Sequence, residues 1–186
     1  MDCGGPMDSN APELRSARQQ QIVDAAWGLL EANGPDGLTM RRLADELGIK
    51  APSLYKHFPN KQVVEAALID RGFLLWGNAA RESLTRTGDP LANLARAYRA
   101  VAVEHPHIYR LMTGGALDRS LLTPGVEEWS GAPLGEPFQD PEAARAFWGF
   151  LHGLAILEID GRFPPDADLD RCWERGVAAF SALSRG

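Results

Sequence analysis

The segment "LTMRRLADELGIKAPSLYKHFPNKQVVEAAL", residues 38–68, contains the pattern of two short helices joined by a tight turn. Thr39 can cap the start of a very short helix, and Gly48 can end it. Apolar residues at helical spacing lie on one face of this helix: Leu43, Ala44 and Leu47. Pro52 fits the first turn of a second short helix, which we expect to run to about His57. Two short helices joined by a tight glycine turn predict a helix-turn-helix.

The outer side of the second helix is rich in groups that bind nucleic acids. Residues 39–61 contain five basic and two acidic residues, although the whole chain has a formal net charge of −6. The phosphate backbone of DNA binds cations and hydroxyls, and base edges bind short donors and acceptors. Because the second helix of a helix-turn-helix enters the major groove, we expect this one to bind DNA. The alternative is a basic surface helix without a partner.

The same segment closely resembles the DNA-binding module of TetR-type transcriptional regulators. These proteins share the pattern Gly-(Val/Ile)-x-x-x-x-Leu-Tyr-x-His-Phe-x-x-Lys, which residues 48–61 match, and the resemblance extends over residues 12–68. It implies phosphate contacts by Thr39, Tyr55, His57 (through its backbone) and Lys61. It implies base-facing positions at Arg41, Lys50, Ala51, Pro52, Ser53 and Lys56. Ala51 departs from family members with a polar side chain there, so base reading should depend on Arg41, Ser53 and Lys56.

The rest of the chain also has helical periodicity, and no segment alternates convincingly as a strand. Further helices are expected at about 12–33, 60–81, 89–104, 107–112, 117–129, 140–160 and 168–184. Four of them have candidate N-caps at Asn60, Asp89, Asp140 and Asp168. We predict an all-α fold of about nine helices, with a three-helix DNA-binding module and a C-terminal lobe for ligand binding and dimerisation. The predicted domains are a flexible tail (1–11), the helix-turn-helix domain (12–59) and the regulatory domain (60–186).

The last two long helices are the expected dimer interface. The stretch "FWGFLHGLAILEIDGRF", residues 147–163, resembles the Trp-x-x-x-His-Gly helix of one subset of the TetR-type regulators. In that family these two helices pair with those of a second subunit in a four-helix bundle. Gly149, Gly153 and Ala155 independently allow close helix approach, so we expect a homodimer.

A regulator of this kind usually binds a small molecule in a mostly apolar pocket with a few polar groups. The candidate effector-binding residues are Phe73, Trp76, Tyr98, Tyr109, Met112, Phe147, Phe150 and His152. Few basic residues lie among these apolar faces, which favours a neutral or cationic, partly apolar effector over a multiply charged anion. The alternative is that each of these side chains fills the core.

Other kinds of site have weak signals. His105 and His107 are two apart with no third ligand nearby, so we expect no metal site and no cofactor. His152 is six residues from Glu158 and eight from Asp160, off the shared helix face that a catalytic pair needs. No nucleophile, metalloprotease or phosphate-loop motif is present, so an enzyme is not expected.

Composition fits this interpretation. The chain has 186 residues, 45% of them hydrophobic and 24% charged, which suits a globular protein with one domain and a small module. No apolar run approaches the roughly 20 residues that span a bilayer, and the N-terminus lacks a secretory h-region. Cys3 and Cys172 suggest neither a disulfide framework nor a metal site. We therefore expect a cytoplasmic repressor that a small ligand releases from a pseudo-palindromic operator on double-stranded DNA. The alternatives are a similar regulator without a diffusible ligand, or a helical interaction protein.

Overall fold

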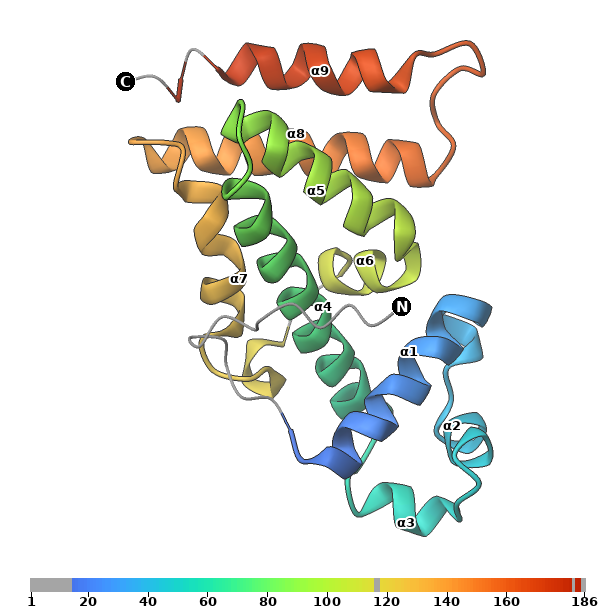
Figure 1. Cartoon of the computed structure of the whole chain (residues 1–186). Coiled ribbons are helices and arrows are strands. Elements are labelled where there is room, and N and C mark those ends of the chain that lie inside the picture. Colours follow the sequence, from blue (N-terminus) through green and yellow to red (C-terminus); the bar gives the residue numbers. More distant parts are fainter. Residues whose placement is uncertain (1–14, 116–117, 182, 185–186) are drawn as a thin grey trace. The chain divides into compact units, whose positions relative to one another are not determined.

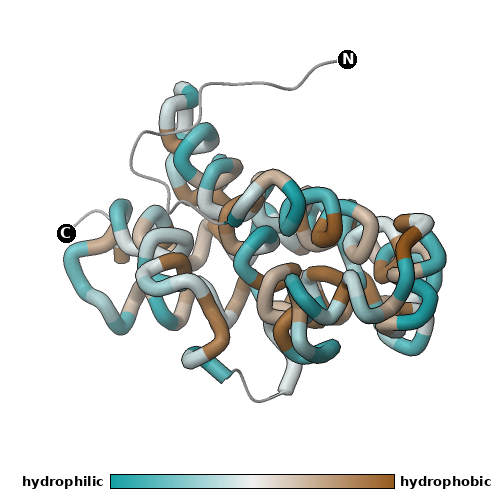
Figure 2. Tube along the Cα trace, turned by 90° about the horizontal axis from the view of Figure 1, so that it is seen from below, coloured by the Kyte–Doolittle hydropathy of each residue, from teal (hydrophilic) through white to brown (hydrophobic). Residues whose placement is uncertain are grey.

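The computed structural model describes residues 15–115, 118–181, 183 and 184, and the tail expected at 1–11 lies outside them. Within these residues the fold is all-α, as predicted (Figure 1). Its elements are α1 (Ala17–Gly37), α2 (Met40–Glu46), α3 (Ala51–Tyr55), α4 (Lys61–Leu84), α5 (Pro90–Glu104), α6 (Pro106–Thr113), the 3-10 helix η1 (Arg119–Leu121), α7 (Val126–Gly135), α8 (Pro141–Ile159) and α9 (Leu169–Phe180). Hydrophilic and hydrophobic residues interchange along the helices, as expected when each buries one face (Figure 2).

The predicted N-caps are confirmed, which explains why the helices begin where they do. Each cap side chain accepts a hydrogen bond from a backbone N–H in the first turn. The pairs are Thr39 with Arg42 at 3.2 Å, Asn60 with Val63 at 3.0 Å, Asp89 with Leu91 at 3.0 Å, Asp140 with Glu142 at 3.0 Å and Asp168 with Arg171 at 3.0 Å. These bonds satisfy donors that have no partner within the helix itself.

One predicted helix is wrong in position. The helix expected at 117–129 is instead α7, which begins at Val126, after the short η1. Pro124 and Gly125 separate the two, and Gly125 has a φ of +80°, which a helix does not contain. The remaining differences are at helix ends: α3 ends at Tyr55 rather than near His57, and α1 continues past a non-helical Gly34 to Gly37.

The chain forms two compact units. The N-terminal unit contains the described residues up to 74 together with 105–127, and the C-terminal unit contains 75–104 and the described residues from 128 onward. The boundary therefore falls within α4. The units are packing groups, and the predicted domain division between residues 59 and 60 stays a prediction.

The core of the N-terminal unit joins the helix-turn-helix to α1, to α6 and to the first part of α4. Its fully buried side chains include Ile22, Leu30, Leu43, Leu54, Phe58, Leu68 and Ile108. Two polar contacts add to this packing. The Glu31 carboxylate of α1 accepts a hydrogen bond from the backbone N–H of Ile108 at 2.8 Å. The buried Asp70 carboxylate binds the Arg15 guanidinium at 2.7 Å and the Thr123 hydroxyl at 2.8 Å.

In the C-terminal unit, α5, α8 and α9 pack against one another (Figure 1). Phe147 of α8 is fully buried, and its ring lies 5.5 Å from that of Phe138 and 5.3 Å from that of Phe180. Beside this aromatic cluster, the Arg99 guanidinium binds the Glu158 carboxylate at 2.8 Å, and the Trp173 indole N–H donates to the same carboxylate at 2.9 Å. This network links one residue from each of the three helices.

Candidate nucleic-acid interface

The two helices of the motif are held by a short, well-defined turn. Gly48 adopts a φ of +63°, a left-handed conformation that side chains disfavour, and its N–H donates to the Asp45 carbonyl at 3.0 Å. Ile49 N–H then donates to the Ala44 carbonyl at 3.0 Å. Ala44 is 3% exposed and Leu54 is fully buried, so the inward sides of α2 and α3 are fixed in the core. The outward side of α3 is consequently set by the fold.

That outward side displays the residues predicted to contact DNA. Exposed side chains at and around α3 are Lys50, Ala51, Pro52, Ser53, Tyr55 and Lys56, while His57 is half-buried. The Tyr55 ring is 47% exposed although it is large and aromatic. Among the described residues, no ion pair or hydrogen bond engages the side chains of Arg41, Lys50 or Lys56. These cations are therefore available to an external anion.

Two of the residues predicted to bind phosphates, Thr39 and Lys61, lie at the N-terminal ends of helices. Thr39 caps α2 with its hydroxyl oxygen as acceptor, which leaves the hydroxyl proton free to donate. Lys61 is the first residue of α4, where the helix dipole favours an anion. Its ammonium lies 3.2 Å from the Glu65 carboxylate and donates to the Pro35 carbonyl at 3.2 Å. Lys61 is thus held near the motif in a half-exposed position.

Some residues that shape this surface were not found by sequence reasoning. Asn33 accepts a hydrogen bond from the Arg42 guanidinium at 3.2 Å, which ties α2 to the end of α1. Glu65 pairs with Lys61, and this contact could be predicted from the sequence because opposite charges four residues apart meet on a helix. The contact between Asn33 and Arg42 could not be predicted, since it depends on how α1 and α2 pack.

The predicted effector-binding residues divide between the two units. Phe73, Tyr109 and Met112 belong to the N-terminal unit, where Met112 and Ile108 pack against Gly72. Trp76, Tyr98, Phe147, Phe150 and His152 belong to the C-terminal unit. There, the rings of Trp76 and Tyr98 meet edge to face at 5.0 Å, and those of Phe147 and Phe150 stack at 6.1 Å. Burial lowers the pKa of His152, whose ring lies 6.4 Å from that of Trp148.

The histidines considered for other chemistry have packing roles. The His105 ring meets Trp27 edge to face at 5.2 Å, and the His107 ring lies against Gly34. Glu158, the acid considered beside His152, binds Arg99 and Trp173 instead. Within the described ranges, no group of three or more His, Cys, Asp or Glu side chains could hold a metal ion. None of the described helices is long and apolar enough to cross a membrane.

The geometry is that of a helix-turn-helix regulator, and the comparisons with known proteins agree. Residues 22–68 match the model of bacterial regulatory proteins of the tetR family, and residues 91–180 match the tetracyclin repressor-like C-terminal domain. The chain belongs to the TetR family. It is therefore a DNA-binding transcriptional regulator.

Individual relatives cover most of the chain. An uncharacterized HTH-type transcriptional regulator, Rv0681 of Mycobacterium tuberculosis, is 34% identical, over 88% of this chain and 80% of its own. The HTH-type transcriptional repressor KstR2 of the same species is 35% identical, over 88% of this chain and 78% of its own. Among solved structures, the multidrug binding protein EbrR complexed with ethidium has a TM-score of 0.68 and 25% identity, over 89% of this chain and 98% of its own.

Proposed function

We propose that the chain is a homodimeric repressor that binds a pseudo-palindromic DNA operator and releases it when a small molecule binds. The observation that supports this most strongly is the set of exposed cations on the helix-turn-helix that have no partner among the described residues. Such groups gain most from a polyanion, because they need not first give up an internal ion pair. The cytoplasm, where the chromosome lies, is the proposed compartment, and the proposal includes no catalytic step.

The proposed DNA contacts divide into two kinds. Thr39, Tyr55, Lys61 and the backbone of His57 would bind phosphates and set the position of α3 in the major groove. Arg41, Ser53 and Lys56 would read base edges, with Lys50 beside them. Ala51 and Pro52 offer only apolar contact, for example to a thymine methyl group.

This division can be tested with a pool of random duplexes. The wild-type protein should enrich a pseudo-palindrome with half-sites one helical turn, or a multiple of it, apart. Ser53→Ala and Lys56→Gln should relax the sequence preference at particular positions, whereas Tyr55→Phe should weaken binding to all sequences alike. If Tyr55→Phe changed the preferred bases and Lys56→Gln did not, the two roles would have to be exchanged.

A second copy of the chain is the proposed partner of α8 and α9. Trp148 and Leu157 of α8 are 49% and 42% exposed, so a partner helix could bury apolar surface there. A Cβ added at Gly149 or Gly153 of the same helix would meet no atom within 4 Å outside the helix's own backbone, so another helix could approach closely there. Both the exposed apolar side chains and the open glycines suit the four-helix bundle expected from the family.

The variant Gly153→Arg tests this interface. Within one protomer the new side chain meets no atom near its Cβ, so the fold should persist, while a closely packed partner helix would be displaced. Sedimentation should show a monomer with unchanged helicity and greatly weakened operator binding. An intact dimer for this variant would place the interface elsewhere.

The proposed effector is neutral or cationic and at least partly apolar. The aromatic residues of the C-terminal unit, among them Trp76 and Tyr98, offer faces that bind apolar or cationic groups. The Trp129 indole N–H adds a hydrogen-bond donor, since it is buried without a partner among the described residues. The structurally similar protein EbrR has been solved in complex with ethidium, an aromatic cation and thus a ligand of this class.

Thermal-shift screening of metabolites and antibiotics would find such a ligand, because binding to the native state raises Tm. Tyr98→Ala should then reduce the response to the ligand while leaving operator binding without ligand unchanged. A destabilised variant with an unchanged response would assign Tyr98 to the core. If every candidate aromatic residue behaved in that way, a regulator without a diffusible ligand would be the better account.

A further inference from the structure

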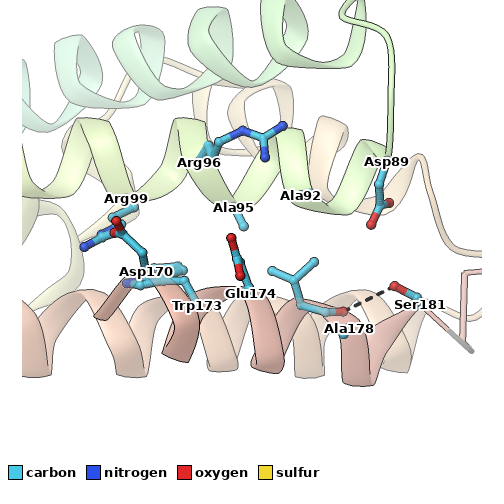
Figure 3. A pocket seen from close by; sticks show the side chains of 11 residues that line it. Asp89, Ala92, Ala95, Arg96, Arg99, Asp170, Trp173, Glu174, Ala178 and Ser181 are labelled. Carbon is cyan, nitrogen blue, oxygen red and sulfur yellow. Dashed lines mark hydrogen bonds and ion pairs between the residues drawn. The ribbon is translucent and has the colours of Figure 1, made fainter. Parts of the chain in front are cut away.

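The C-terminal unit contains a groove between α5 and α9 that neither the DNA-binding surface nor the candidate effector residues use. Its volume is about 440 Å³. The lining consists of Asp89, Ala92, Ala95, Arg96, Arg99, Asp170, Trp173, Glu174, Val177, Ala178 and Ser181 (Figure 3). None of the eight effector candidates is among these residues.

The groove is long and has a floor of small apolar side chains. Its two helices run antiparallel, with Asp89 and Ser181 at one end and Arg99 and Asp170 at the other (Figure 3). Ten residues of α-helix correspond to about 15 Å, which sets the length of the groove. Between the ends lie Ala92, Ala95, Val177 and Ala178. Methyl groups of this kind accommodate an extended alkyl chain without strain and bind it by burial of apolar surface.

The charges in the groove leave an excess of carboxylate. The Arg99 guanidinium is neutralised by Glu158 at 2.8 Å and by Asp170 at 2.5 Å. The Glu174 carboxylate has no ion pair or hydrogen bond with any residue that the structure describes, and it points from α9 toward α5 (Figure 3).

At the other end, Asp89 uses one oxygen to cap α5. Arg96 is the other cation in the lining, and its guanidinium donates to the neutral Asn93 side chain at 2.5 Å. Apart from the neutralised Arg99, the lining therefore offers two carboxylates, Asp89 and Glu174, against one guanidinium.

We propose that this groove binds a linear aliphatic polyamine. Ammonium groups separated by methylene segments match carboxylates separated by an alanine-lined floor. One ammonium would bind Glu174, a second would bind the free oxygen of Asp89, and the methylenes would cover Ala92, Ala95 and Ala178. The charged groups supply orientation, and the apolar floor distinguishes an alkyl polyamine from a compact cation of the same charge. This site is independent of the proposed effector and its release of DNA.

Calorimetric titration of the full-length protein with spermidine tests the proposal. Glu174→Gln removes one carboxylate, and Asp89→Asn removes the other while keeping a good N-cap for α5. Each change should weaken spermidine binding about tenfold or more, as expected for loss of one charge-assisted hydrogen bond. Ala178→Leu should weaken it as well by filling the groove without altering charge. Glu128→Gln is the matched control, since this exposed carboxylate on α7 does not line the groove. The affinity of this variant for spermidine should stay within twofold of the wild-type value.

Two further probes separate groove binding from general attraction to an acidic protein. Hexaamminecobalt(III) carries the same charge as spermidine without methylenes, and it should bind more weakly and respond little to Ala178→Leu. Glutarate tests the opposite assignment, in which Arg96 makes this an anion site. Equal spermidine binding by Glu174→Gln and Glu128→Gln, no spermidine binding, or a preference for glutarate would each overturn the proposal. Circular dichroism of every variant should match that of the wild type, and Glu174→Gln still decides the question if Ala178→Leu folds poorly.

Discussion

Basic side chains have different roles in the helix-turn-helix and in the C-terminal unit. Arg41, Lys50 and Lys56 face outward and pair with none of the described residues. In contrast, Arg99 binds two carboxylates, and Arg81 lies over the Trp129 ring at 3.8 Å while donating to its carbonyl at 2.6 Å. Arg99 and Arg81 therefore stabilise the fold, whereas Arg41, Lys50 and Lys56 are free to bind an external anion. Substitutions that break the contacts of Arg99 should therefore change stability, and substitutions of the exposed cations of the motif should change DNA affinity.

The largest effect on stability is expected for Phe147→Ala. This ring is fully buried among Phe138, Phe150 and Phe180, so its removal leaves a cavity in the C-terminal unit. The free energy of unfolding should fall by about 3–5 kcal/mol, measured by urea denaturation. A stable variant that binds its operator but no longer releases it would instead assign Phe147 to the effector site.

A smaller loss is expected for Glu158→Gln, which breaks the network around Arg99. The hydrogen bond to Glu158 is the largest cause of the raised pKa of Arg99, with burial acting in the opposite direction. The Gln side chain keeps the shape but removes the charge, so the free energy of unfolding should fall by about 1–3 kcal/mol. Operator affinity should not change if the protein is kept folded. Loss of DNA affinity without loss of stability would show that the Arg99 network acts on DNA binding and not on the fold.

Tyr55→Phe tests the helix-turn-helix, where a substitution should change DNA affinity and not stability. Its ring is 47% exposed, so removal of the hydroxyl should leave the urea midpoint unchanged. A lost hydrogen bond to phosphate should cost about 1 kcal/mol of binding free energy, or roughly fivefold in Kd on any duplex. Fluorescence anisotropy measures the Kd for operator and for unrelated DNA, and urea denaturation measures the midpoint. A stability loss without an affinity loss would mean that the hydroxyl supports the fold.

The smallest effect concerns pH and His152. Burial lowers the pKa of this side chain below its ordinary value of 6.5, so the unfolded chain takes up a proton more readily than the folded one. Stability should therefore fall as pH drops through the unfolded pKa and level off below the folded pKa. His152→Gln should reduce the fall in the urea midpoint between pH 7.5 and pH 5.5. The other three histidines are present in both proteins, so an unchanged difference would locate the pH dependence elsewhere.

Local signals explain what the sequence could predict. Five N-caps, the turn at Gly48 and the inward side of α3 depend on residues close together in the chain, and all were predicted correctly. The helix expected at 117–129 instead begins at Val126, because Gly125 has a positive φ that interrupts the helix. The partners of Asp70 could not be predicted, since Arg15 and Thr123 are each more than fifty residues away. Such contacts depend on tertiary packing, which periodicity does not encode.

The same distinction applies to the sites. The surface around α3 follows from one contiguous motif, so its residues could be named from sequence. The groove between α5 and α9 combines residues from 89–99 and 170–181, which only the folded chain brings together. A sequence shows which residues have binding chemistry, but it does not show which of them share a cavity.

The salt dependence of DNA binding by Lys61→Gln tests directly whether the helix-turn-helix binds DNA phosphates through this residue. The slope of log K against log salt should become shallower by about 0.9 for each phosphate contact that is lost. Arg145→Gln is the matched control, because Arg145 is an exposed cation paired with Glu142 in the C-terminal unit. We predict a reduced slope for Lys61→Gln and the wild-type slope for Arg145→Gln, with equal urea midpoints for both. A wild-type slope for Lys61→Gln, or an equal reduction in both variants, would contradict the account.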